Sequence, residues 1–208
     1  MLSVSELILS SYQLAAQQQV AITQAWVQGS HRLGGSLSKS GLHTSIQRVG
    51  RLDAVLRCME DELISEVLSD EIRPWVAEPL GSLSEIWIGQ VYEIIRLSQE
   101  RKLIADSSFL KALAHDFRLL RITMEKHEIA QDRSLSEPIA MFRVPAKEND
   151  VDYMYDKKDP QRSHIMPTGI SHRGSFQWLA IDVCNSPAQR WLERRELSDR
   201  VLQLLLDA

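Results

Sequence analysis

The segment from His115 to Glu128, HDFRLLRITMEKHE, holds the side chains best suited to chemistry in this chain. Arg121 and His127 are separated by five residues. On one straight helix their side chains therefore point about 120° apart. They converge only at a kink, or across a two-fold axis where two copies of the helix meet. Glu125 follows Arg121 by four residues, which is the spacing of an intrahelical ion pair.

The Arg121-x5-His127 spacing on a long helix resembles the Arg-x(4–6)-His pattern of the HEPN superfamily, the higher eukaryotes and prokaryotes nucleotide-binding domain. The resemblance covers roughly residues 44–133. It implies a small helical bundle, often dimeric, that binds RNA or nucleotides or cleaves RNA without a metal ion. In its ribonucleases the arginine steadies the phosphate and the histidine handles protons, which are the roles implied here for Arg121 and His127. Ile122 departs from the pattern, because the ribonucleases prefer a polar residue after the arginine.

A structural interpretation competes with this catalytic one. Glu93 and Arg96 are three residues apart on the preceding predicted helix. If the two helices face each other, these residues join Arg121, Glu125 and His127 in one polar cluster. Such a cluster more often fixes the register of two helices than performs catalysis, although buried charge is poor evidence of stability.

The dipeptide His115-Asp116 resembles the HD metal phosphohydrolases in its two residues only. A metal site needs several convergent ligands, and His43 and Asp132 are the remaining candidates. We therefore expect no metal site and no cofactor.

Composition argues against broad electrostatic binding to nucleic acid or membranes. The chain of 208 residues has a net charge of −4 and a pI of about 5.9. Its densest basic group lies near the C-terminus and is predicted to be a solvated helix face. This group comprises Arg190, Arg194, Arg195 and Arg200.

The two cysteines, Cys58 and Cys184, lie within or at the end of apolar runs and are predicted to be small buried residues. No stretch approaches the roughly 18 apolar residues that span a bilayer. The first residues lack the basic start of a signal peptide. We expect a cytoplasmic protein without a membrane segment.

Apolar residues recur every three to four positions and predict four long helices before residue 132. Pro74 and Pro79 are expected to break helical structure between residues 70 and 81, with Trp75 and Val76 packing back onto the core. The expected helices run over 2–27, over 44–68, from Ser82 or Ser84 to Leu103, and from Asp106 or Ser107 to Asp132.

The pattern changes after residue 138. Residues 139–144 and 176–183 are β-prone runs, which predict a β-hairpin-like arm. The polar stretch 145–175 between them is typical of a functional or mobile loop and is a candidate surface for a protein partner. A terminal helix is expected from about Ser186 to Leu206.

We therefore predict a mainly α-helical bundle of about five helices, with a small β-hairpin-like insertion before the C-terminal helix. Residues 1–135 form the bundle, 136–185 the arm, and 186–208 the helix that packs back, within one domain. The leading functional prediction is an HEPN-like homodimer that binds or cleaves RNA or nucleotides, a metal-independent endoribonuclease if it is an enzyme. The alternative is a non-enzymatic interaction module in which Arg121, Glu125 and His127 only hold helices together.

Overall fold

The computed structural model describes residues 3–34, 41–141, 153–184 and 188–207. This part of the chain is mainly helical, with small antiparallel sheets before the C-terminal helix, which confirms the predicted fold class. The helices are α1 (Val4–Gln18), α2 (Val20–Gly34), α3 (Leu42–Ile64), α4 (Arg73–Glu100), α5 (Ser108–Lys126) and α6 (Arg194–Asp207). The strands are β1 (Ile139–Met141), β2 (Tyr153–Tyr155), β3 (Thr168–Ile170), β4 (Phe176–Asp182) and β5 (Ala188–Glu193). A short 3-10 helix, Asp132–Ser134, precedes β1.

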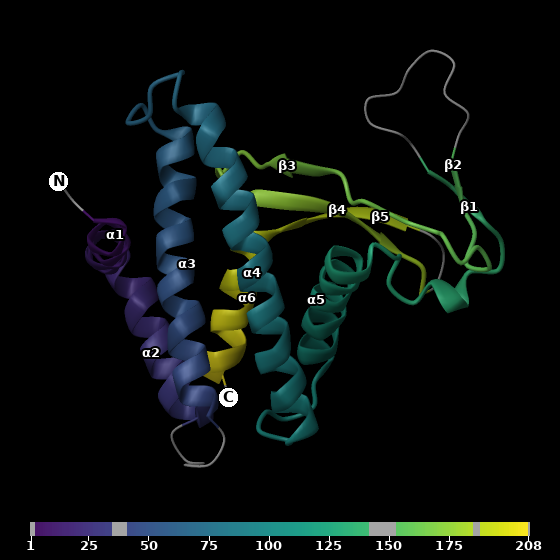
Figure 1. Ribbon diagram of the computed structural model, residues 1–208. Coiled ribbons are helices and arrows are strands. Elements are labelled where there is room, and N and C mark those ends of the chain that lie inside the picture. Colours follow the sequence, from purple (N-terminus) through teal and green to yellow (C-terminus); the bar gives the residue numbers. More distant parts are fainter. Residues whose placement is uncertain (1–2, 35–40, 142–152, 185–187, 208) are drawn as a thin grey trace.

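The body of the molecule is formed by α2, α3, α4 and α6, and α5 packs against α4 and α6 (Figure 1). Aromatic side chains join these layers. The rings of Trp26 and Trp87 meet edge to face with centroids 6.5 Å apart, and the ring of Phe117 lies 5.9 Å from Trp87. All three rings are almost fully buried, so α2, α4 and α5 share one apolar core.

The first predicted helix is divided in two. Gln19, with φ −111° and ψ 47°, ends α1, and α2 starts at the next residue. The Gln19 side chain donates a hydrogen bond to Asp61 Oδ2 at 3.0 Å and so attaches this corner to α3. Because each half keeps a helical periodicity, the change of direction is not visible in the apolar pattern.

The predicted break at the two prolines is wrong, because α4 runs through both of them. Pro74 lies in the first turn, where a helix needs no backbone N–H. Pro79 lies inside the helix and removes one hydrogen bond, and burial of a continuous apolar face of α4 outweighs that loss. Trp75 is 79% exposed and does not pack back onto the core, whereas Val76 does so in part.

The chain before α6 is a strand and not the start of the terminal helix. β5 pairs antiparallel with β4, with Trp178 opposite Leu192 and Asp182 opposite Ala188. The helix begins only at Arg194. Antiparallel pairing satisfies the backbone of both strands at once, and this long-range gain overrides local helix propensity.

The two predicted strands do not pair with each other. β1 pairs with β2, and β4 lies between β3 and β5 in a three-stranded sheet. In Figure 1 this sheet extends from the bundle over α5, and the β1–β2 ribbon lies at the opposite end of the molecule from α1. The sheet closes the main core with Trp178, Ala180 and Leu192.

The described part of the stretch 145–175, for which both a functional and a mobile loop were expected, is docked on the rest of the chain. Tyr155 is fully buried, and its hydroxyl accepts a hydrogen bond from the N–H of Ile129 at 3.1 Å and donates one to Asp132 at 3.0 Å. Met166 enters the main core. Two buried apolar side chains thus anchor a stretch that is polar on average. Residues 142–152 lie outside the described residues.

Among the described residues, no helix is both long enough and apolar enough to cross a membrane.

Candidate functional site

Arg121 is held between α4 and α5 by side chains of both helices. Its guanidinium lies 2.9 Å from Glu125, 3.8 Å from Glu93 and 4.8 Å above the ring centroid of Tyr92. Glu93 also accepts a hydrogen bond from Arg96 at 2.8 Å. Four of the five residues of the predicted polar cluster are therefore linked, and Arg121 is already engaged by two carboxylates.

His127 stands apart from this cluster. It adopts a left-handed backbone conformation, with φ 54° and ψ 35°, and ends α5 short of the predicted Asp132. Its carbonyl accepts a hydrogen bond from the N–H of His164 at 2.7 Å. Its side chain is exposed, and in the described part of the chain no hydrogen bond or ion pair joins it to Arg121. A composite Arg121–His127 site across a dimer axis stays a prediction.

The arginines near the C-terminus do not form a solvated face, which corrects that interpretation. Arg194 is completely buried, and Arg195 and Arg200 are 17% and 22% exposed in their side chains. Each of the four arginines has an acidic partner: Arg190 and Arg200 contact Asp116, and Arg195 lies 2.6 Å from Asp61. These arginines join α6 and β5 to α3 and α5.

Arg194 is the centre of a buried charge network. Its guanidinium donates to both carboxylate oxygens of Glu60, at 2.6 Å each, and also to Asp53. Arg57 donates to Asp53 at 3.0 Å and to Asp199 at 2.6 Å. Burial raises the pKa of the Asp53 carboxyl, but Arg194 and Arg57 more than offset this effect and hold its pKa below the usual value. The network fixes α6 on α3, and we assign it a structural role.

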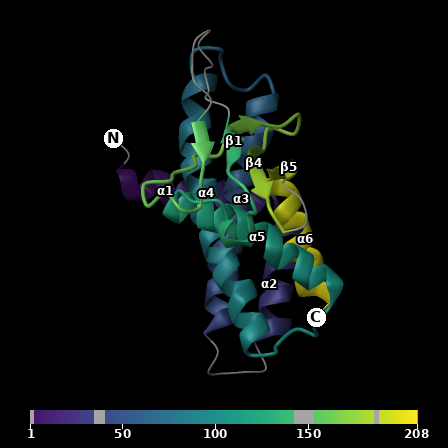
Figure 2. The same ribbon diagram turned by 90° about the vertical axis from the view of Figure 1, so that its right-hand side faces the viewer.

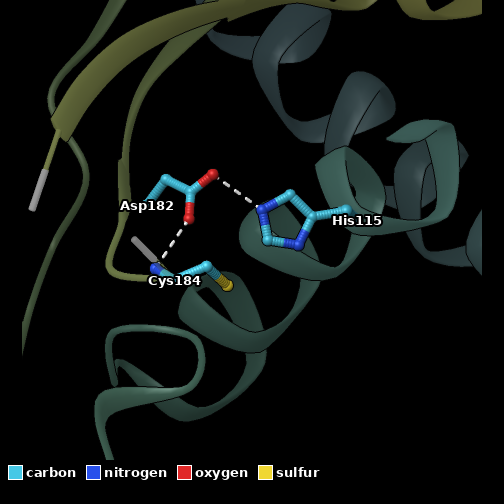
Figure 3. A group of neighbouring side chains, drawn as sticks. All are labelled: His115, Asp182 and Cys184. Atoms are coloured by element: carbon cyan, nitrogen blue, oxygen red, sulfur yellow. Dashed lines mark hydrogen bonds and ion pairs between the residues drawn. The ribbon is translucent and has the colours of Figure 1, made fainter. Parts of the chain in front are cut away.

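Asp116 and His115, the HD dipeptide, point into different surroundings. Asp116 is buried beneath Arg190 and Arg200. His115 Nε2 lies 2.7 Å from Asp182 Oδ2, at the end of β4 (Figure 3). The two halves of the dipeptide thus do not act on one metal ion.

Cys184 completes a group of three side chains with His115 and Asp182 (Figure 3). The backbone N–H of Cys184 donates to Asp182 Oδ1 at 3.1 Å, and the thiol contacts Gln131. One ligand atom from each of His115, Asp182 and Cys184 lies within 4.8 Å of the other two. Cys184 is exposed, contrary to the prediction, whereas Cys58 is buried as predicted.

The electrostatic surroundings of this group are mixed. Burial raises the pKa of Asp182, but hydrogen bonds from His115 and the Cys184 N–H outweigh it, so the pKa is lowered. Burial and the charge of Asp182 raise the pKa of the Cys184 thiol. His115 and Asp182 are 67 positions apart in the chain, and no sequence motif marks such a distance.

The surface of α1 is a second candidate, for binding rather than chemistry. Ala15 is the one buried side chain of α1, and it packs on Ala54 and Cys58 of α3. Six large apolar side chains of α1 are between 39% and 73% exposed: Val4, Leu7, Ile8, Leu9, Tyr12 and Leu14. The helix projects sideways from the bundle (Figure 2).

A groove of about 730 Å³ lies between this projecting helix and the bundle. Leu9 and Tyr12 line it on the α1 side, and Leu83 and Ile86 line it on the α4 side. It also contains Arg48 and Arg51 of α3, both exposed, for which the described residues provide no ion pair.

No protein-family model, curated protein or solved structure matches this chain.

Proposed function

We propose that this chain is a non-enzymatic interaction module that assembles with a second copy of itself through α1. The observation that carries the proposal is the exposure of α1, in which Ala15 is the one buried residue of a 15-residue helix. An isolated helix of about this length is marginal in water. The helix therefore gains most of its stability from a surface that covers its apolar side chains.

The area of the α1 surface suits a second copy. The six exposed apolar side chains leave on the order of 500 Å² open to solvent, which is near the largest apolar patch of an ordinary monomer. In a symmetric dimer the same patch is used twice. Two copies that cover each other's α1 remove roughly 1,000 Å² from water, the lower end of a specific interface and the size of a weak, reversible dimer.

Charge supports the same partner. Glu6 is the one charged residue of α1, and the groove beside α1 carries Arg48 and Arg51. An α1 helix from a second copy thus brings apolar side chains to an apolar groove and one carboxylate to two arginines. Attraction across an interface mainly selects the partner and the orientation.

The test of this proposal is the molar mass of the untagged chain in solution, measured by light scattering and sedimentation. We expect a monomer–dimer equilibrium over about 1–100 µM. Ile8→Arg places a charge within the apolar patch and should weaken the dimer at least about tenfold without loss of helix in the far-UV circular dichroism spectrum. Val67→Arg is the matched control, because Val67 is 76% exposed in the connection between α3 and α4.

Two outcomes would overturn the proposal. One is a wild-type chain that stays monomeric up to about 100 µM, which would leave α1 for a different partner. The other is a dimer that Ile8→Arg and Val67→Arg affect equally.

The competing ribonuclease prediction has its own test. If Arg121 is a structural residue, the wild-type chain does not cleave RNA in the presence of a chelator. Arg121→Ala then lowers the free energy of unfolding by less than about 1 kcal/mol, because the side chains of Glu93 and Glu125 are 41% and 48% exposed and water screens the pairs. Chelator-resistant cleavage that falls about a hundredfold in both Arg121→Ala and His127→Ala would establish the enzyme instead.

A further inference from the structure

Three side chains of the types that bind zinc meet where α5 approaches the end of β4 (Figure 3). His115 provides an imidazole nitrogen, Asp182 a carboxylate and Cys184 a thiol. Imidazole, carboxylate and thiolate are the ligands of protein zinc sites, and the thiolate excludes the oxygen-seeking ions Mg²⁺ and Ca²⁺. We propose that His115, Asp182 and Cys184 bind one Zn²⁺ ion.

The distances allow a zinc ion without rearrangement of the backbone. Tetrahedral zinc holds neighbouring ligand atoms roughly 3–4 Å apart. His115 Nε2 and Asp182 Oδ2 are 2.7 Å apart, and the three ligand atoms lie within 4.8 Å of one another. Side-chain rotations that move each ligand atom by about 1 Å therefore bring the nitrogen, the oxygen and the sulfur to within bonding distance of one zinc ion.

Neighbouring contacts hold the backbone at each of the three ligand residues. Asp116, next to His115, is held by Arg190 and Arg200, and this holds the turn of α5 that carries the imidazole. Asp182 is the last residue of β4 and is paired with Ala188. The N–H of Cys184 binds the Asp182 carboxylate, which keeps the thiol on the same side. Ligands held in advance lower the entropy cost of binding.

The charges balance when zinc is bound. Zinc binds Nε2 of His115 in place of the hydrogen bond to Asp182, with the proton of the neutral imidazole transferred through solvent to Nδ1, and the Cys184 thiol releases its proton to solvent. Zn²⁺ with one carboxylate and one thiolate has no net charge. The bound site therefore does not repel the nearby Arg190 and Arg118. Arg190, 3.9 Å from Asp182, remains paired with Asp116, and Arg118 lies on the Cys184 side.

Three protein ligands leave one position of a tetrahedral ion open. A zinc site of this kind holds a water molecule or an exogenous ligand in the fourth position. The site also lies at the edge of a pocket, because Cys184 lines the one bounded by Arg118, Lys126 and Arg133. Cys184 is exposed, so solvent reaches the sulfur side of the site.

The experiment uses the untagged full chain, freed of metal and titrated with Zn²⁺ in competition with a coloured chelator. We expect one ion per chain with a Kd below about 1 µM. Co²⁺ should give a thiolate-to-cobalt charge-transfer band, which reports the bond to sulfur. Cys184→Ser and His115→Gln should each weaken binding at least about a hundredfold and abolish or shift that band.

Cys58→Ser is the matched control, because Cys58 is the other cysteine and is buried on α3. It should bind Zn²⁺ as the wild type does. Zinc should also protect Cys184 of the wild-type chain from alkylation, as read by peptide mass spectrometry, which requires no variant to fold. Wild-type binding weaker than about 10 µM would overturn the proposal. Unchanged binding by Cys184→Ser would overturn it too.

Discussion

Arg194 is the residue on which the packing of α6 against α3 depends most directly. Replacing it by Met leaves Glu60 and Asp53 buried with fewer cations to pair with. An uncompensated buried charge costs about 3–5 kcal/mol. We therefore expect Arg194→Met to lower the free energy of unfolding in urea by about that amount.

Arg96→Ala is the control for this prediction. Arg96 pairs with Glu93 and Glu100 at the surface, and exposed pairs contribute less than about 1 kcal/mol. Equal losses in Arg194→Met and Arg96→Ala would show that burial adds nothing to the network.

His164 predicts a dependence of stability on pH. Its side chain is buried, and burial lowers the pKa of the imidazole from 6.5 to about 4. Because the folded pKa is the lower one, the unfolded chain binds the proton first. The contribution to stability is complete above pH 6.5 and is lost as the pH falls toward 4. The loss amounts to about 3 kcal/mol.

The measurement compares urea unfolding at neutral pH and near pH 4. In His164→Leu the difference in unfolding free energy between the two pH values should be smaller than in the wild type by about 3 kcal/mol. His172→Ala, at an exposed position, should keep the wild-type difference. If His164→Leu keeps this difference as well, folding does not lower the pKa of His164.

The helix contacts predict opposite effects for two glycine substitutions. A Cβ at Gly50 of α3 would lie 2.5 Å from the Trp26 side chain of α2, so Gly50→Ala should destabilise by about 1–3 kcal/mol. A Cβ at Gly89 of α4 meets nothing within 4 Å in the described part of the chain. Gly89→Ala should therefore stabilise by about 0.5–1 kcal/mol through helix propensity. Thermal unfolding followed at 222 nm, the helix band, tests both signs. Stabilisation by Gly50→Ala would mean that α2 and α3 are not in close contact.

The helices and the three-stranded sheet should unfold together. Trp26 and Trp87 of the helices and Trp178 of β4 belong to one apolar core, and the Arg194 network joins the end of β5 to α3. Tryptophan fluorescence and far-UV circular dichroism should thus give the same urea midpoint, as in a two-state transition. A fluorescence change that clearly precedes the loss of helix would show that the sheet is a separate folding unit.

Local pattern was sufficient to predict that the core is helical and which face of α5 is buried. The burial of Leu110, Leu113, Phe117 and Leu120 follows from their spacing alone, and Ser107, one of the two residues at which this helix was expected to start, caps α5. The predictions were wrong where the local conformational preference of a segment disagrees with the stability that it gains from tertiary contacts. Pro79 was expected to lie in a break between two helices, and residues 188–193 to belong to the terminal helix. In both places packing or strand pairing outweighs the preference of the segment.

The sequence by itself determined that this chain is a mainly helical protein with a small β region before its last helix, because hydrophobic periodicity is a local property. Only the tertiary structure decided the partners of its charges. Arg194 meets Glu60 over 134 positions and His115 meets Asp182 over 67 positions. From the sequence alone, a basic residue is predicted to be solvated. A charge is buried only when it has a partner of opposite charge, and local spacing does not reveal a partner that is distant in the chain.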